Sequence, residues 1–275
     1  PSPAPGPERS APVPELWTHH VAPFMLVLAR VGGLFVFAPL LSSAAHPMQA
    51  RALLAVMFAA VLYPILTASP AAAAAAGSWD LPSAAVLLAS EALVGAAIGF
   101  LAAVPVLAVQ VGGMVMGQQL GLGLAAVYNP AMETDGDLVG ELLLYLTMAV
   151  FMALGGLEAA FLAVARGFEH LPPGAFAAGP AAASVLGIAV GLVHAGFELA
   201  LRVAAPVLCI LMLETLAAGL VMKIMPQLNI LSVGFAVKIV LGFMALAAAV
   251  HAVGDAVGEE MQRGLRAMLE WSIGR

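Results

Sequence analysis

The sequence predicts an all-α integral membrane protein, and two observations support this fold class. Hydrophobic residues make up 63% of the 275 residues and charged residues only 9%, where an ordinary soluble domain has about 25% charged residues. Several apolar runs also reach the length of roughly 18 residues that is typical of a membrane-spanning helix. A soluble alanine-rich helical bundle is the alternative, but this chain lacks the charged surface that such a bundle needs.

A window of roughly 19 residues divides the chain into about six apolar segments. They are Ala22–Leu41, Ala52–Leu66, Pro82–Val111, Leu138–Val164, Ala181–Met222 and Ile230–Val250. The fifth is too long for a single span of about 20 residues, and Pro206 lies inside it. We expect either two spans or one long bent helix that leaves the bilayer plane, with a break or kink at Pro206.

Two regions lie outside this series, residues 1–16 and residues 255–275. The first is rich in proline, serine and alanine, so we expect a disordered extension. It lacks the basic stretch and adjoining apolar core of a signal peptide, so membrane insertion would rely on the first apolar segment. The second is an amphipathic tail that we expect to lie on a membrane surface or against a partner. Its apolar face consists of Met261, Leu265, Met268 and Leu269, opposite Glu260, Arg263 and Arg266. Residues 17–254 are the expected membrane domain.

Six spans would place both ends of the chain on one side of the membrane. Arg9, Arg166, Arg263, Arg266 and Arg275 would lie on that side, and Arg51 and Lys223 on the other. Because cytoplasmic loops carry an excess of Lys and Arg, this distribution favours cytoplasmic termini. A seventh span would reverse the conclusion.

Composition and motifs exclude several function classes. The formal net charge of −6 argues against nucleic acid as a partner, since phosphate binding needs clustered Lys and Arg. The sequence motifs of zinc proteases, serine hydrolases and phosphate-binding loops are absent. The one cysteine, Cys209, lies within an apolar run and provides no disulfide framework. We therefore expect no catalytic, metal or cofactor site.

Charged residues inside the apolar runs are more informative, because each costs on the order of 3 kcal/mol at the middle of a bilayer. Glu198 and Arg202 are spaced four residues apart, so they can pair on one face of a helix. The whole set admits two explanations: a pathway for ions or protons, or contacts that are buried in protein or lie outside the hydrocarbon. Its members are Arg30, Glu91, Glu158, Glu198, Arg202, Glu214 and Lys238.

Small residues recur at four-residue steps in three places, which predicts smooth helix faces that pack closely. The three stripes are Gly95, Gly99 and Ala103; Gly113, Gly117 and Gly121; and Gly187, Gly191 and Ala195. Such stripes are common in membrane proteins, so they indicate tight packing and do not identify a function.

Two polar segments interrupt the apolar runs: GQQLGLGLAAVYNP at residues 117–130 and MPQLN at residues 225–229. Irregular backbone at membrane depth is tolerated only where it is buried in protein or lines a water-filled cavity. Either segment is also compatible with an exposed loop. The first carries no charged side chain, so we expect it to be shielded.

These segments also carry a family resemblance. The first pattern is GQQLGLG at residues 117–123 with Asn129-Pro130, followed by Gly155-Gly156 and by FEHLPPG at residues 168–174. The second is the stretch 205–242, with the core PQLNI at residues 226–230, SVGF at residues 232–235 and Lys238. Together with Arg30 and Pro39, these patterns make the chain similar to the FliR family of flagellar export proteins, from about Trp17 to Val250.

The resemblance implies a fold of helical hairpins in a protein that is one subunit of a helical, hetero-oligomeric export gate. The other subunits would be several copies of FliP-like and FliQ-like proteins, with an FlhB-like switch protein associated. Such a gate passes unfolded flagellar proteins across the bacterial inner membrane in the flagellar basal body. Much of the complex would lie above the bilayer plane, where charges inside apolar segments contact neighbouring subunits.

The resemblance also implies two groups of site residues. In the family, the loop between the third and fourth hydrophobic segments plugs the closed pore, and flexible methionines before it suit a compliant seal. The gate residues are then Met114, Met116, Gly117, Gln118, Gln119, Gly121, Gly123, Asn129 and Pro130. The inter-subunit or intramembrane polar residues are Arg30, Glu198, Arg202, Lys223, Pro226, Gln227, Asn229 and Lys238.

Three positions depart from the family pattern. Asn129 stands where an aspartate is common, Glu214 where an uncharged residue is common, and Ala236 where a proline is usual. Injectisome relatives of the SctT type share the architecture, although the Gly-Gln-x-x-Gly form is closer to the flagellar branch. A secondary transporter or channel, and a structural scaffold whose loops never gate, are the other functions to test.

Overall fold

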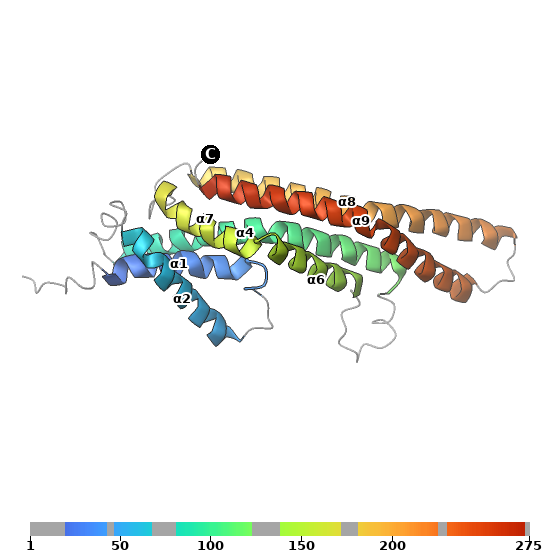
Figure 1. The fold of residues 1–275 in the computed structure, drawn as a ribbon. Coiled ribbons are helices and arrows are strands. Elements are labelled where there is room, and N and C mark those ends of the chain that lie inside the picture. Colours follow the sequence, from blue (N-terminus) through green and yellow to red (C-terminus); the bar gives the residue numbers. More distant parts are fainter. Residues whose placement is uncertain are drawn as a thin grey trace, which may run out of the picture. The chain divides into compact units, whose positions relative to one another are not determined.

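The computed structural model describes residues 20–42, 47–67, 81–122, 138–171, 181–224 and 230–272, and all of their regular structure is helical (Figure 1). The predicted all-α fold class is therefore confirmed. The helices are α1 (Ala22–Phe37), α2 (Met48–Thr67), α4 (Leu81–Leu120), α6 (Leu138–Ala153), α7 (Gly156–His170), α8 (Ala181–Ile224) and α9 (Ile230–Ser272).

Each of the six predicted apolar segments lies mainly in helix, but few of the helices can cross a membrane unaided. Among the described residues, two helical stretches are long and apolar enough, Pro82–Leu120 and Val190–Ile224. The bent pair formed by α6 and the first part of α7 would add a third span. The chain is thus an all-α membrane protein, with several shorter apolar helices such as Ala22–Phe37 and Gly234–Ala248.

The fourth predicted segment is interrupted, whereas the fifth is a single helix. The fourth is divided at Leu154 and Gly155 into α6 and α7, which are bent by 59°. Gly155 has φ +72°, a backbone conformation that glycine adopts without steric cost. The fifth is one helix of 44 residues that continues through Pro206. Of the two alternatives that the sequence left open, one long helix is observed.

The helix α4 extends further than the sequence predicts. We expected a connector from Gly112, but α4 continues to Leu120 and ends at Gly121, which has φ +80°. The amide of Gly121 donates to the carbonyl of Gln118 (3.0 Å), and the amide of Leu122 donates to that of Gly117 (3.2 Å). This pair of bonds is the Schellman motif, in which a left-handed glycine ends a helix.

The chain folds into two compact units, each of which is described by itself. Unit 1 comprises Pro1–Gly99, Phe161–Val185 and Glu270–Arg275, and unit 2 comprises Phe100–Ala160 and Leu186–Leu269. The helices α4, α7, α8 and α9 contribute residues to both.

In unit 1, α1 packs directly against the backbone of α4. A Cβ atom added at Gly33 would collide with the carbonyl oxygen of Ala92, and one added at Gly95 with that of Arg30. At Gly99 the nearest atom would be the carbonyl oxygen of Leu34, at 2.7 Å. The stripe of Gly95 and Gly99 therefore serves close packing, as its spacing predicted.

Aromatic rings and one arginine connect α2 to α1 and α7. Phe58 of α2 stacks on Phe161 of α7, with ring centroids 3.9 Å apart. Phe35 of α1 lies against both rings at 6.3 and 6.4 Å. Arg51 of α2 donates to the carbonyl of Phe35 (3.2 Å), near the C-terminal end of α1, where helix carbonyls have no partner within the helix.

Unit 2 has its own apolar core, to which α4, α6, α8 and α9 all contribute. Core residues with at most 3% exposure include Val109, Met116 and Leu120 of α4, Leu143 of α6, Val203, Val207 and Leu211 of α8, and Val257 of α9. Glycines again allow close approach. A Cβ atom added at Gly113 would lie 2.6 Å from the Cα of Gly140, and one added at Gly112 would lie 2.8 Å from the carbonyl oxygen of Ala200. Gly191, in the third predicted stripe, has no described atom within 4 Å of such a Cβ.

Residues 255–272 of the amphipathic tail predicted at 255–275 form the last part of α9, which continues through position 255 without interruption. Its apolar residues Val257, Met261 and Leu265 are buried inside the chain itself. A Cβ added at Gly264 would lie 3.2 Å from the ring of Pro105 on α4. Two residues of the predicted apolar face, Met261 and Leu265, are therefore buried within unit 2, and the contact of the tail with a membrane surface or a partner stays a prediction.

Two adjacent glycines of α1 provide a matched test of the backbone contact. We expect Gly33→Ala to lower the stability of the full-length chain by about 1–3 kcal/mol, because α1 must move away from α4. Gly32→Ala meets no described atom within 4 Å, so it should be neutral or raise stability by up to about 1 kcal/mol through helix propensity. Thermal unfolding in detergent measures both, and equal shifts for the two variants would contradict the contact.

Candidate functional site

The residues of the predicted gate lie at the C-terminal end of α4 or beyond it. Met114 is 38% exposed, whereas Met116 is completely buried in the core of unit 2. Gln118 and Gln119 are exposed in the last turn of α4, and Gly117 is buried beside them. The expected loop over residues 117–130 therefore begins only at Gly121, because the Schellman motif keeps the preceding residues helical.

The methionines differ in what they can do at a gate. Met114 exposes part of its side chain at the surface of α4. Met116 already packs inside unit 2, so its contribution is to hold the end of α4 in place. Gly123, Asn129 and Pro130 lie outside the described residues.

A buried polar contact surrounds Arg30 in unit 1. Its guanidinium donates from Nε to Oε2 of Glu91 (2.6 Å), and Nη2 lies 2.6 Å from the same oxygen. Nη2 also donates to the carbonyl of Leu171, at 3.0 Å. The ring of Phe168 lies 3.9 Å from the guanidinium carbon, within the range of a cation–π contact. Arg30 is fully buried and Glu91 is 1% exposed.

These contacts show how the chain accommodates two of its intramembrane charges. Arg30 on α1 and Glu91 on α4 neutralise each other, and the guanidinium also holds the residue that follows α7. The sequence marked both residues as charges within apolar runs but did not pair them, since 61 residues separate them. The opposite signs of the two charges were the only signal for the pair.

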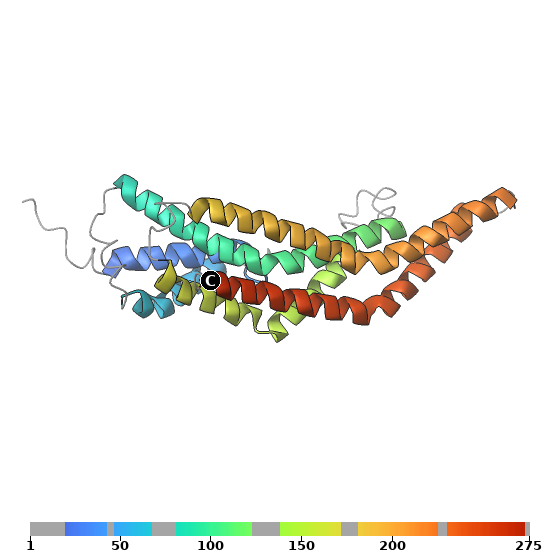
Figure 2. The same ribbon diagram turned by 90° about the horizontal axis from the view of Figure 1, so that it is seen from above.

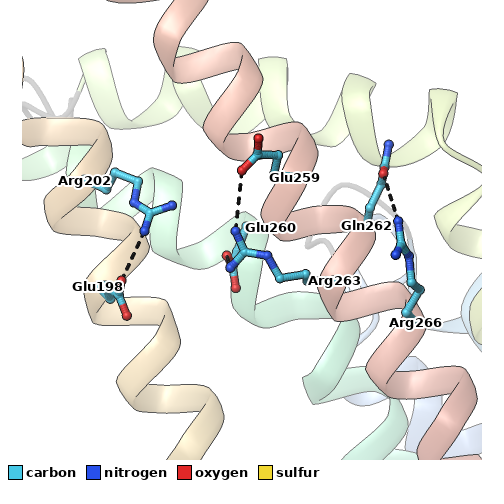
Figure 3. A network of polar contacts seen from close by, with 7 residues as sticks. All are labelled: Glu198, Arg202, Glu259, Glu260, Gln262, Arg263 and Arg266. Atoms are coloured by element: carbon cyan, nitrogen blue, oxygen red, sulfur yellow. Dashed lines mark hydrogen bonds and ion pairs between the residues drawn. The ribbon is translucent and has the colours of Figure 1, made fainter.

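A second polar group lies in unit 2, on the exposed faces of α8 and α9 (Figure 3). The predicted i, i+4 pair is confirmed, because Arg202 Nη2 lies 3.2 Å from Glu198 Oε1, with 48% and 62% of the side chains exposed. On α9, Arg263 contacts Glu259 (3.5 Å) and Glu260 (2.5 Å). Exposed pairs of this kind contribute less than about 1 kcal/mol each, so they add little to the stability of unit 2.

The other predicted polar residues are distributed along the α8–α9 hairpin. Lys223 is exposed in the last turn of α8, where a positive charge complements the helix dipole. Lys238 of α9 is partly buried. Pro226, Gln227 and Asn229 lie outside the described residues. In the described part of the chain, no group of three or more His, Cys, Asp or Glu residues could hold a metal ion.

The buried pair and the exposed pair provide a second matched test. Glu91→Gln leaves the buried guanidinium of Arg30 without a counter-charge, so we expect a loss of about 3–5 kcal/mol. Glu198→Gln removes the same charge from an exposed pair and should cost less than about 1 kcal/mol. Folded yield and thermal unfolding of the full-length chain check the difference, and similar losses in both variants would show that the Arg30 contact is not a buried pair.

The sequence of this chain is similar to those of known proteins. The model of the family described as bacterial export proteins, family 1, matches residues 21–264. The chain is 28% identical over 233 residues to the flagellar biosynthetic protein FliR of Bacillus subtilis, which covers 81% of this chain and 84% of that protein. It is 27% identical over 245 residues to FliR of Escherichia coli, with 85% and 86% covered. A shorter stretch of 88 residues is 31% identical to the secretion system apparatus protein SsaT of Salmonella typhimurium, covering 32% and 34%.

The family match covers both described units, from the start of α1 to the last third of α9. It confirms the resemblance to FliR proteins that rests on residues 117–130 and 205–242. Its members are components of an export apparatus and not enzymes. The chain therefore belongs to the bacterial export proteins, family 1.

Proposed function

We propose that this protein is a core subunit of the flagellar type III export gate in the bacterial inner membrane. With FliP-like and FliQ-like subunits it forms the pore through which unfolded flagellar proteins leave the cytoplasm, and an FlhB-like switch protein associates with it. The observation that carries the proposal is the family match over residues 21–264, together with the similarity to FliR proteins over most of the chain.

The surface of α8 supports a role as one subunit among several. The most apolar 18-residue window of Val190–Ile224 is only 11% buried within the chain. The corresponding window of Pro82–Leu120 is 67% buried. Large apolar side chains remain exposed along α8, which forms a helical hairpin with α9 (Figure 2). They include Phe197, Leu201, Met212, Leu213, Leu216 and Leu220, each 60% exposed or more. Apolar surface on this scale marks contact with protein or lipid.

A shallow groove between α4 and α8 in unit 2 adds to this surface. It has a volume of about 150 Å³ and is lined only by apolar side chains, among them Leu107, Val111, Val193 and Phe197. Gly196 lies at the helix contact, where an added Cβ would be 3.1 Å from Val104. Small residues between larger apolar ones suit the close packing of a further helix.

Within this gate, we assign the closure of the pore to residues 117–130 and to Met114 before them. The segment leaves α4 at Gly121, the left-handed residue that ends this helix, and it is rich in glycine and free of charge. Glycines let such a segment pack tightly when the pore is closed and rearrange when a polypeptide enters. The exposed methionine side chain adapts to different substrates.

An injectisome export gate is the second candidate, and the similarity to SsaT favours it. Flagellar function agrees better with the longer matches, since the FliR proteins of Bacillus subtilis and Escherichia coli cover more than 80% of this chain. The genes beside this one would distinguish the two systems.

Co-expression with the FliP-like and FliQ-like proteins of the same organism tests the assembly. We expect a stable complex of fixed stoichiometry, and a several-fold lower recovery of it when Leu213 and Leu220 are both replaced by Asn, because polar side chains disfavour an apolar interface. The control is Glu259→Gln with Arg263→Gln, which removes an exposed ion pair from α9. A protein that transports ions as a monomer or homodimer would contradict the gate and favour a transporter.

Deletion of residues 118–124 tests the assigned plug. We expect higher ion conductance of the assembled complex in planar bilayers, because the segment that fills the closed pore is shortened. Deletion of seven residues from another connector, Pro70–Ala76, is the control for loop shortening as such. Conductance that stays at the level of the intact complex would refute the plug and favour a scaffold whose loops do not gate.

A further inference from the structure

The side chain at the end of α4 lies on a glycine of α9. Leu120 is the last residue of α4 and is completely buried in unit 2. A Cβ atom added at Gly242 of α9 would collide with Cδ2 of Leu120 and would lie 3.1 Å from its Cγ. The branched end of Leu120 therefore occupies the space in which any other residue at position 242 would have its side chain.

A leucine of α8 borders the same position. Cδ2 of Leu211 would lie 3.2 Å from the Cβ atom added at Gly242, and Leu211 is completely buried in the same core as Leu120. We call the position formed by Gly242 and Leu211 the Leu120 socket. Because protein interiors are close-packed, a side chain held between two helices in this way cannot move unless those helices move as well.

The chain directly after Leu120 is also held in place. Gly121 has φ +80°, and the Schellman bonds of Gly121 and Leu122 close the end of α4. Leu122 packs against the same core as Leu120. The residues on both sides of the left-handed glycine are thus attached to unit 2, so side-chain contacts as well as backbone bonds fix the direction in which the chain leaves α4.

The helices that form the socket also carry exposed apolar side chains close to it. Met212 directly follows Leu211 on α8, and Met244 lies two residues after Gly242 on α9. Both methionines are more than 60% exposed. On α8 they belong to the surface to which we assign contact with other subunits. A shift of either helix caused by such a contact would act directly on the side chain of Leu120.

We propose that Leu120 is the positioning residue of the plug. Seated in its socket, it holds the base of residues 117–130 on the hairpin of α8 and α9, and the pore stays closed only while Leu120 stays seated. Rearrangement during export then begins after Leu122, and separation of α9 from α8 releases the base of the plug. The inference rests on the proposed function, since it requires residues 117–130 to close the pore.

Gly242→Ala tests the socket, because its methyl group takes the place of the Leu120 side chain. We expect the complex assembled with FliP-like and FliQ-like proteins to pass several-fold more current in planar bilayers with KCl on both sides. Gly254→Ala is the matched control on α9: no described atom lies within 4 Å of its added Cβ, so the current should stay at the level of the unmodified complex. A Gly242→Ala complex that is equally closed overturns the proposal.

Leu120→Ala is the second variant, and it decides the question if Gly242→Ala does not assemble. It adds no atom to the core and removes the side chain that holds the plug, so we again expect a several-fold higher current. Leu199→Ala removes a leucine of the same core that is also almost completely buried, and it should leave the pore closed. Equal currents in these two variants would mean a general loosening of unit 2 and would overturn the proposal.

The deletion of residues 118–124 separates this proposal from the plug itself. If the deletion raises the current and neither Gly242→Ala nor Leu120→Ala does, the plug stands and the role of Leu120 is refuted. If the deletion leaves the current unchanged, the plug and the role of Leu120 are refuted together.

Discussion

Close approach of helix backbones is the constraint on which both units of this protein depend. Where helices face lipid, burying apolar side chains gains little, so association relies on van der Waals contact and on polar groups. Gly33 and Gly95 bring α1 against α4, and Gly112 and Gly113 bring α4 against α8 and α6. A side chain at any of these points would separate two helices over a whole contact face and remove many small dispersion contacts together. A chain with so few charged residues has little else to fix its helices with.

The same close packing explains why Arg30 needs such a complete set of partners. The contact of α1 with α4 leaves its side chain no path to water, and Arg30 is fully buried as a result. A buried ion pair is weak support for stability, because two well-packed apolar residues often do as well. What the guanidinium adds is direction: its planar donors reach Glu91 on α4 and the carbonyl of Leu171 at once, which fits only one register of these helices.

Local patterns predicted the helices well, and their ends and partners less well. Long apolar runs are sufficient evidence for a helix in a membrane protein, so the segments were found, including α8 with its internal proline. The apolar run was ended too early, at Val111, because glycines and glutamines follow it. Gly112 and Gly113 serve packing, and α4 ends only before Gly121. The burial of Met261 and the pairing of Arg30 depend on residues far away in the sequence, and no local pattern contains that information.

Hydropathy alone does not distinguish a surface that faces lipid from one that faces another subunit, and α8 illustrates the difficulty. With 44 residues at about 1.5 Å each it is roughly 66 Å long, about twice the thickness of a bilayer's hydrocarbon core. One membrane cannot cover all of it, yet apolar side chains from Phe197 to Ile224 stay exposed. The exposed pair of Glu198 and Arg202 lies on the same helix, and charged groups are costly in hydrocarbon. The part of α8 that carries this pair is therefore better suited to contact with neighbouring protein than to burial in lipid.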